Sequence, residues 1–175
     1  MCSFSTRFGH LSNSQLSALL DQYYQTVITI IYKYNGEIDK IIGDGIIAIF
    51  GKPFLNLTEM QLFDKAEDCA KALITATKGT QFKSKIALHD GTVMYYRNKS
   101  VHYPEYTIIG KPITELHRLE SIANDEAVNF YFSSKYGRHT GSKYHGYPWS
   151  LTNLQVIAPP LKGVSHSYKR CLEKL

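Results

Sequence analysis

A chain of 175 residues with 43% hydrophobic and 20% charged residues is long enough for one globular domain, or one domain with a small appendage. The formal net charge of +5 favours an anionic ligand. No run of basic residues is long enough to form a nucleic-acid-binding arm, and a polyphosphate fits this charge as well as a nucleic acid does. We expect no nucleic-acid partner.

The cysteines are Cys2, Cys69 and Cys171, an odd number without Cys-x-x-Cys spacing. They predict neither a disulfide framework nor a zinc site, so a reducing compartment, the cytoplasm, is the simplest location. We also expect no signal peptide and no membrane span in this chain, because no stretch has the required pattern or length of apolar residues.

The N-terminal part predicts a short strand at residues 1–4 and then a long helix. Ser12 or Ser14 can cap the helix, and Asn35 with Gly36 predicts its end. Between them, apolar residues recur at the spacing of one helix face. These residues are Leu16, Leu19, Leu20, Tyr23, Tyr24, Val27, Ile28 and Ile31.

Residues 37–51 predict two short strands joined by a tight turn. Alternating residues at 38–42 and an apolar run at 46–50 flank Gly43, Asp44 and Gly45. A carboxylate held rigidly at a hairpin tip suits a hard cation such as magnesium, which binds carboxylates together with substrate phosphates. An ordinary Asp-Gly turn explains the same residues, so the segment alone leaves both roles of Asp44 open.

The next stretch predicts a loop at residues 52–56 and a second helix from about Thr58 to Thr77, closed by Gly79. The predicted packed face of this helix consists of Ala66, Cys69, Ala70, Ala72, Leu73 and Ala76.

Residues 83–89 predict a strand that turns at Asp90-Gly91 and pairs with residues 92–96 as a hairpin. Another strand is predicted at 106–109. Pro112 then suits the first turn of a helix. The apolar residues of that helix are Ile113, Leu116, Leu119 and Ile122.

A strand at residues 127–132 follows, then a loop with a short helix from residue 133, and closing strands at 149–157 and 166–172. Helices mixed with hairpins predict an α+β sandwich related to the ferredoxin-like plan, with a doubly wound parallel sheet as the alternative. We expect one domain over residues 1–175.

Several segments carry recognisable motifs in order along nearly the whole chain. They are residues 7–12 (RFGHLS), 40–50 (KIIGDGIIAIF), 88–91 (LHDG), 106–110 (YTIIG) with 118–123 (RLESIA), and 161–163 (LKG). Together they resemble the catalytic domain of class III nucleotidyl cyclases, the adenylate and guanylate cyclase family.

The resemblance implies a ferredoxin-like α/β sandwich and a reaction in which the ribose 3′-hydroxyl of ATP, or of a related nucleoside triphosphate, attacks the α-phosphate. The products are cyclic AMP and pyrophosphate. Such a reaction needs two metal ions, Mg²⁺ or Mn²⁺, and cationic groups at the developing charge. In this family the site lies between two cyclase domains, so a homodimer or a heterodimer with another cyclase domain is expected.

The same resemblance implies that three residues of the predicted strands and their turn bind substrate or metal. Asp44 is expected to be a metal ligand, Lys40 to donate to the purine ring, and Thr107 to recognise the base. A threonine beside a lysine is similar to the adenine-selecting pairing of many bacterial enzymes.

Arg118 is expected to stabilise charge at the reacting phosphate, which suits the donor fork of a guanidinium, and Lys162 to hold the triphosphate. Two positions depart from the family pattern. Phe4 stands where the first metal-binding aspartate is expected, and Thr114 replaces the asparagine that orients the ribose. A hydroxyl offers one donor where an amide offers two, so both changes should weaken the chemistry.

Three functions remain open at this stage. The first is an adenylate-cyclase-like enzyme, which is either impaired or active with altered metal use. The second is a non-catalytic domain that binds nucleotide or a complete cyclase partner. The third is a nucleic-acid-binding ferredoxin-like module, which needs aromatic residues on an open sheet face. An error in aligning the first strand, or a start that is not the natural one, also explains Phe4.

Overall fold

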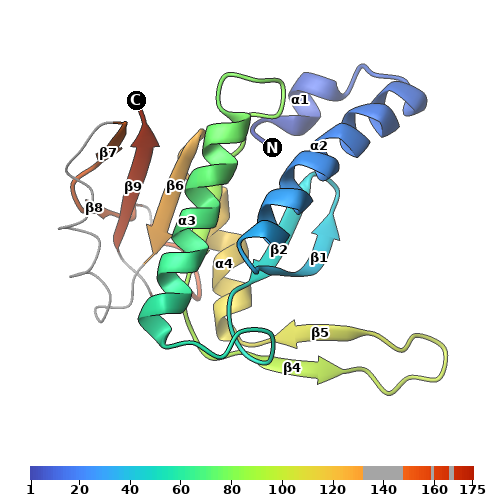
Figure 1. The fold of residues 1–175 in the computed structure, drawn as a ribbon, viewed down its shortest axis with the longest axis vertical. Helices are drawn as coiled ribbons and strands as arrows, with labels where there is room; N and C mark the ends of the chain where they lie inside the picture. Colours follow the sequence, from blue (N-terminus) through green and yellow to red (C-terminus); the bar gives the residue numbers. More distant parts are fainter. Residues whose placement is uncertain (132–147, 159, 166–167) are drawn as a thin grey trace. The chain divides into compact units, whose positions relative to one another are not determined.

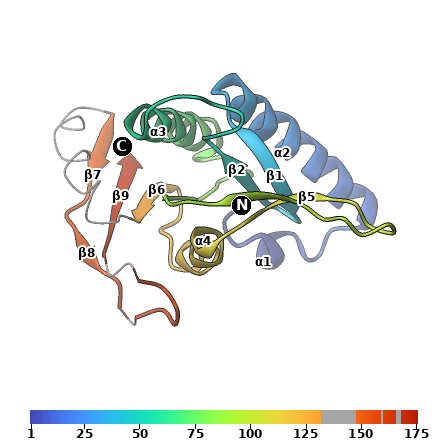
Figure 2. The ribbon, with the colours of Figure 1, turned by 90° about the horizontal axis from the view of Figure 1, so that it is seen from below.

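The computed structural model describes residues 1–131, 148–158, 160–165 and 168–175, which fall into two compact units, Met1–Ser84 and Lys85–Leu175 (Figures 1 and 2). Each unit builds its own buried interior from helices and strands. Within these residues, no helix combines the length and the apolar character that crossing a bilayer requires.

The first unit contains three helices and a hairpin. Their order is α1 (Phe4–Phe8), α2 (Asn13–Lys33), β1 (Glu37–Ile42), β2 (Gly45–Ile49) and α3 (Glu59–Thr77). The predicted helices and the predicted hairpin are therefore confirmed. At the start of α2, the Ser12 hydroxyl accepts a hydrogen bond from the Gln15 backbone while the Gln15 side chain accepts one from the Ser12 backbone, which forms a capping box. The side chains that α2 buries, Leu19, Tyr23, Val27 and Ile31, are four residues apart.

The strand predicted at residues 1–4 is wrong, because this part of the chain turns into the short helix α1. Ser3 has a φ of 51°, in the left-handed region, which breaks any extended run. The buried Cys2 donates from its N–H to the Lys83 carbonyl at 2.8 Å but belongs to none of the strands of the described residues. The Arg7 guanidinium donates to the carbonyls of Cys2 and Gln81 and holds α1 in place.

The packed face of α3 is partly as predicted. Cys69, Ala70 and Leu73 are buried, whereas Ala66 and Ala72 are half-buried and Ala76 is exposed. The buried face is rotated toward Glu67, Ile74 and Thr77 because α3 packs against α2. Polar members of this face bond within the helix: the Thr77 hydroxyl donates to the Leu73 carbonyl, and Lys71 lies 3.3 Å from Glu67.

The second unit is built on a five-stranded sheet in the order β3-β6-β9-β7, with β8 paired to β9. The strand β6 is buried along its whole length and is parallel to β3 and antiparallel to β9. The elements are β3 (Ile86–His89), β4 (Met94–Arg97), β5 (Tyr106–Ile109), α4 (Lys111–Ser121), β6 (Ala127–Tyr131), β7 (Trp149–Leu151), β8 (Gln155–Val156) and β9 (Tyr168–Lys174). The described residues do not include the loop and short helix expected from residue 133, up to residue 147. They also leave out residues 132, 166 and 167 of the predicted strands.

The predicted hairpin between residues 83–89 and 92–96 is wrong. The strand β4 pairs with β5, with Met94 opposite Ile109 and Arg97 opposite Tyr106, and together they form a separate two-stranded sheet (Figure 1). The strand β3 instead joins the central sheet beside β6. Burial explains the choice: all four residues of β4 are exposed, whereas those of β3 are half-buried and complete the interior.

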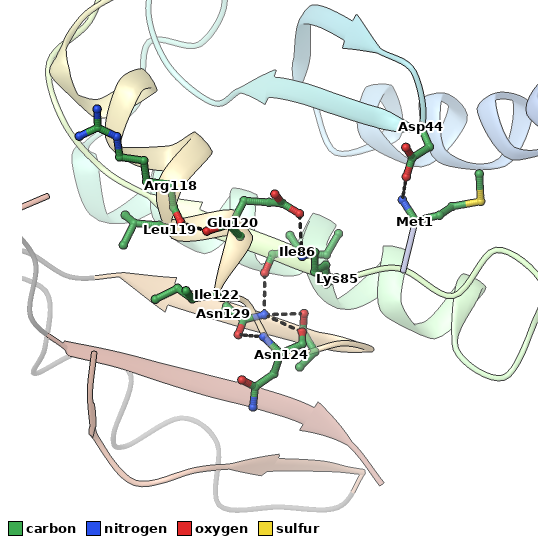
Figure 3. A network of polar contacts seen from close by, with 12 residues as sticks. Met1, Asp44, Lys85, Ile86, Arg118, Leu119, Glu120, Ile122, Asn124 and Asn129 are labelled. Atoms are coloured by element: carbon green, nitrogen blue, oxygen red, sulfur yellow. Dashed lines mark hydrogen bonds and ion pairs between the residues drawn. The ribbon is translucent and has the colours of Figure 1, made fainter. Parts of the chain in front are cut away.

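A buried amide links the end of α4 to the sheet (Figure 3). Asn129 on β6 accepts a hydrogen bond from the Asn124 backbone at 2.7 Å and donates to the carbonyls of Ile86, Asn124 and Ala127 at 3.0–3.2 Å. This network fixes the loop between α4 and β6 to β3, and α4 carries two of the candidate site residues.

Candidate functional site

The β1–β2 hairpin carries the two candidate residues of the first unit. Lys40 lies in β1, next to a register shift in the pairing with β2, and is partly buried. Asp44 lies in the turn after Gly43, whose φ of 56° is in the region that glycine adopts easily. The carboxylate is thus presented at a hairpin tip, with 26% of its side chain exposed.

Tyr24 holds this tip from α2. Its hydroxyl donates a hydrogen bond to the carbonyl oxygen of Gly43, the residue before Asp44. Burial and the charge of Asp44 raise the pKa of Tyr24, so the phenol stays protonated and able to donate. Sequence reasoning placed Tyr24 on the apolar helix face and missed this contact, although an amphipathic tyrosine is a common polar anchor at the edge of such a face.

The donor set around Asp44 does not fit a two-metal centre. Its Oδ2 lies 2.5 Å from the ammonium nitrogen of Met1 (Figure 3). Phe4, at the position expected for a first metal ligand, belongs to α1 and packs its ring 5.6 Å from that of Phe8. Across the described residues, no group of three or more His, Cys, Asp or Glu side chains could hold a metal ion. A magnesium or manganese pair needs more oxygen ligands than one carboxylate provides.

The second unit holds the other candidates. Thr107 lies in β5 opposite Tyr96 and is half-buried. Thr114 and Arg118 are both on α4, four residues apart and exposed, so they share one face of the helix. The helix begins with Pro112 in its first turn, as predicted.

The structure brings Arg118 and Lys162 together. The Arg118 guanidinium donates from Nη1 to the carbonyl oxygen of Lys162. Lys162 is exposed in a tight turn closed by a 3.1 Å bond from the Val164 N–H to the Leu161 carbonyl. Gly163 takes a φ of 72° at the third position of that turn, as type II turns require. The cationic side chain of Arg118 is therefore tied to the backbone of a turn that carries a second exposed cation, Lys162, from a distant part of the sequence.

Replacing Gly163 with alanine should displace the Arg118 guanidinium. A β-carbon at this position collides with Nη1 of Arg118, and the positive φ adds roughly 1–2 kcal/mol of backbone strain. The Nε–H signal of Arg118 in a heteronuclear NMR spectrum should therefore shift. Gly79→Ala is the matched control, because Gly79 has a φ of 70° with open space around it, so it introduces the strain without the collision. An unchanged Arg118 signal contradicts the packing described here.

A buried acid, Glu115, lies between the helix α4 and the segment that follows the Lys162 turn. Glu115 on α4 is 3% exposed and contacts His89 at the end of β3, Ser165 after the Lys162 turn, and Lys111 one helical turn earlier. Burial alone raises the pKa of Glu115, but hydrogen bonds from Ser165 and His89 and the Lys111 charge outweigh it and lower the pKa to about 2. Sequence reasoning missed Glu115. The available signal was its position four residues before the buried Leu119.

Comparison of the sequence with known proteins finds distant relatives. No protein-family model matches the chain. Uncharacterized proteins from Mycobacterium tuberculosis and Mycobacterium bovis are 27% identical to it over 139 residues, which is 76% of this chain and 24% of each relative. The chain thus spans about a quarter of the length of these curated relatives.

Comparison of the structure finds cyclase catalytic domains. The catalytic core of a rhodopsin-guanylyl cyclase with converted specificity, in complex with ATPαS, has a TM-score of 0.76 at 18% identity, covering 99% of this chain and 91% of that one. The guanylate cyclase domain of RhGC from Catenaria anguillulae, in complex with GTP, has the same TM-score and coverage at 16% identity. The adenylyl cyclase CyaB from P. aeruginosa has a TM-score of 0.72 at 20% identity, covering 99% of this chain and 90% of that one. The chain therefore has the α+β fold of class III nucleotidyl cyclase catalytic domains.

Proposed function

We propose that residues 1–175 form a single adenylate-cyclase-type domain that binds ATP at a seam with a second cyclase domain. In this proposal the chain contributes to the formation of cyclic AMP and pyrophosphate only when its partner supplies the metal-binding carboxylates. The carrying observation is that Arg118, an exposed cation on α4, binds the backbone of the turn that carries the exposed Lys162.

The charge of this pair suits a triphosphate. A guanidinium presents a fork of donors that matches two phosphate oxygens, and an ammonium adds a mobile point charge. Arg118 is proposed to stabilise charge at the reacting phosphate and Lys162 to hold the remaining phosphates. That the chain shares its fold with cyclase cores solved with ATPαS and with GTP supports a nucleotide as the ligand.

The other candidates are assigned to the nucleoside. Lys40 and Thr107 are proposed to recognise the adenine base, and Thr114, on the same helix face as Arg118, to contact the ribose. The hydroxyl of Thr114 is a short donor, so we expect weaker ribose orientation than an asparagine gives. Cytoplasmic ATP is the natural source of this ligand.

The incomplete metal site argues for a partner. Mg²⁺ or Mn²⁺ supplies the charge neutralisation in this class of reaction, and Asp44 alone does not hold two such ions. The β4–β5 hairpin offers apolar side chains on both of its faces, Met94 and Ile109 on one and Tyr95 and Tyr106 on the other, and each is 43–55% exposed. A two-stranded sheet with exposed apolar residues on this scale gains stability from a covering surface.

A second candidate is a domain that binds ATP or pairs with a cyclase without contributing to turnover. The observation that favours it is that the helix α1 stands where a strand carrying the first metal-binding residue was expected. A nucleic-acid module fits less well, because the central strand β6 and its aromatic residues Phe130 and Tyr131 are buried rather than presented on an open sheet face.

Complementation tests the proposal. The purified chain should bind ATP in a calorimeter but form little cyclic AMP alone with Mg²⁺ or Mn²⁺. It is then mixed with a cyclase domain that keeps both metal-binding aspartates but has alanine in place of its own arginine equivalent to Arg118. Recovery of cyclic AMP synthesis in the mixture supports the proposal, and ATP binding without recovery supports the non-catalytic alternative. Absence of ATP binding contradicts the proposal and the ATP-binding form of the alternative, and leaves only a domain that pairs with a cyclase.

A further inference from the structure

Glu115 is a buried carboxylate with both oxygens engaged. Its Oε1 accepts hydrogen bonds from the Ser165 N–H at 3.0 Å and from the Ser165 hydroxyl at 2.9 Å. Its Oε2 lies 3.2 Å from Nε2 of His89. A buried carboxylate is costly unless it is paired and hydrogen-bonded, and here the bonds come from two separate segments of the unit. The side chain thus bridges α4 to the end of β3 and to the segment after the Lys162 turn.

His89 gives this bridge a rigid base. Its side chain is 1% exposed, and its Nδ1 lies 3.3 Å from the carbonyl oxygen of Tyr131 at the end of β6. The ring therefore connects Glu115 to the central strands of the sheet. On the solvent side, the Lys111 ammonium lies 3.5 Å from Oε1 of Glu115 and donates to the Ser165 hydroxyl at 3.0 Å.

The turn that carries Lys162 and the residue after it are consequently held at two points by one helix. Arg118 binds the Lys162 carbonyl, and Glu115, three residues earlier on α4, binds Ser165. The first and last residues of the turn, Leu161 and Val164, pack against the buried cluster around Leu119. Of these contacts, Glu115 supplies two hydrogen bonds, both to Ser165, while its other oxygen contacts His89.

We infer that Glu115 is a positioning residue that holds the Lys162 turn on α4, so that the Lys162 ammonium and the Arg118 guanidinium keep a fixed spacing for a polyphosphate. This inference rests on the proposed nucleotide-binding function. Without the Glu115 bridge, Ser165 loses both bonds and the turn can move away from Arg118. Recognition of the phosphates then suffers, while recognition of the nucleoside, which does not use this turn, does not.

The binding test compares ATP with adenosine. Glu115→Ala should weaken ATP binding roughly ten-fold, the scale of one lost charge-assisted contact, and change adenosine binding less than two-fold. Glu115→Gln should restore much of the loss, because its amide oxygen can still accept from Ser165 and its NH₂ can face His89. Glu120→Ala is the matched control: this acid is on the same helix but pairs at the surface with Lys85, at 3.0 Å. Equal losses of ATP and adenosine binding overturn the inference.

Amide exchange tests the bridge without any ligand. The Ser165 N–H should exchange slowly in the wild type, at least ten-fold faster in Glu115→Ala, and unchanged in Glu120→Ala. Ser165→Ala keeps the backbone bond and alters only an exposed side chain, so it folds even if Glu115→Ala does not; it should lower ATP affinity a few-fold. An unchanged Ser165 exchange rate in a folded Glu115 variant overturns the inference. Failure of the wild type to bind ATP, with exchange as expected, contradicts the proposed function and leaves the bridge intact.

Discussion

Replacing Arg118 with alanine should lower the rate of cyclic AMP formation in the complementation assay by about 100- to 1000-fold, the usual cost of losing one preorganised charge-stabilising group. The exposed guanidinium is tied to the Lys162 carbonyl and so needs little reorganisation when charge develops on the phosphate. ATP binding should fall much less, since the contact strengthens in the transition state. Product is measured by chromatography and binding by calorimetry.

Two variants separate charge from geometry. Arg118→Lys keeps the positive charge but loses the donor fork, and should recover only a small part of the rate. His117→Ala changes the neighbouring exposed side chain of α4 and should leave the rate unchanged. A rate for Arg118→Ala within three-fold of the wild type, in a mixture that forms cyclic AMP, contradicts the role assigned to Arg118.

Local signals account for the parts of the fold that the sequence predicted. The helix α2 is capped by Ser12 and ends before Asn35, whose φ of 65° marks the left-handed residue that the Asn-Gly pair suggested. The helix α3 begins with a capping box at Thr58 and Gln61. The β1–β2 hairpin follows from its glycine-rich turn. Each of these features is encoded within a few residues and needs no knowledge of the tertiary structure.

Strand pairing was predicted less well because it depends on distant residues. An Asp-Gly pair at 90–91 is typical of a hairpin turn, yet the chain beyond it pairs with β5, and β3 finds its partner in β6. The choice follows from which strand can be buried, which no local pattern reports. The prediction of a strand at the N-terminus was wrong because Ser3 adopts a positive φ, which its residue type does not indicate.

The candidate site shows the same division. The placement of Lys40 and Asp44 on one hairpin could be predicted from their spacing. The contact between Arg118 and Lys162 and the bridge from Glu115 to Ser165 join segments more than forty residues apart in the sequence, so spacing could not reveal them. The ligand roles of Lys40, Asp44, Thr107, Thr114, Arg118 and Lys162 stay predictions.

Replacing Asn129 with alanine should destabilise the second unit by about 3 kcal/mol or more, a large share of the 5–15 kcal/mol typical of a domain. The side chain is fully buried, and its loss leaves the carbonyls of Ile86 and Ala127 without this donor and the Asn124 N–H without its acceptor. Urea unfolding followed by the fluorescence of Trp149, the single tryptophan, reports on this sheet, because Trp149 lies in β7 beside β9.

Two further variants identify the cause of that loss. Asn98→Ala removes a half-buried amide whose hydrogen bond from the Ser100 N–H, at 2.9 Å, is exposed, and should change stability by less than about 0.5 kcal/mol. Asn129→Asp keeps the shape but turns the NH₂ donor into an acceptor that faces carbonyl oxygens, so at neutral pH it should cost at least as much as alanine. If Asn129→Asp is as stable as the wild type, donation from this amide does not hold the end of α4 to the sheet. The platform under Arg118 must then depend on apolar packing alone.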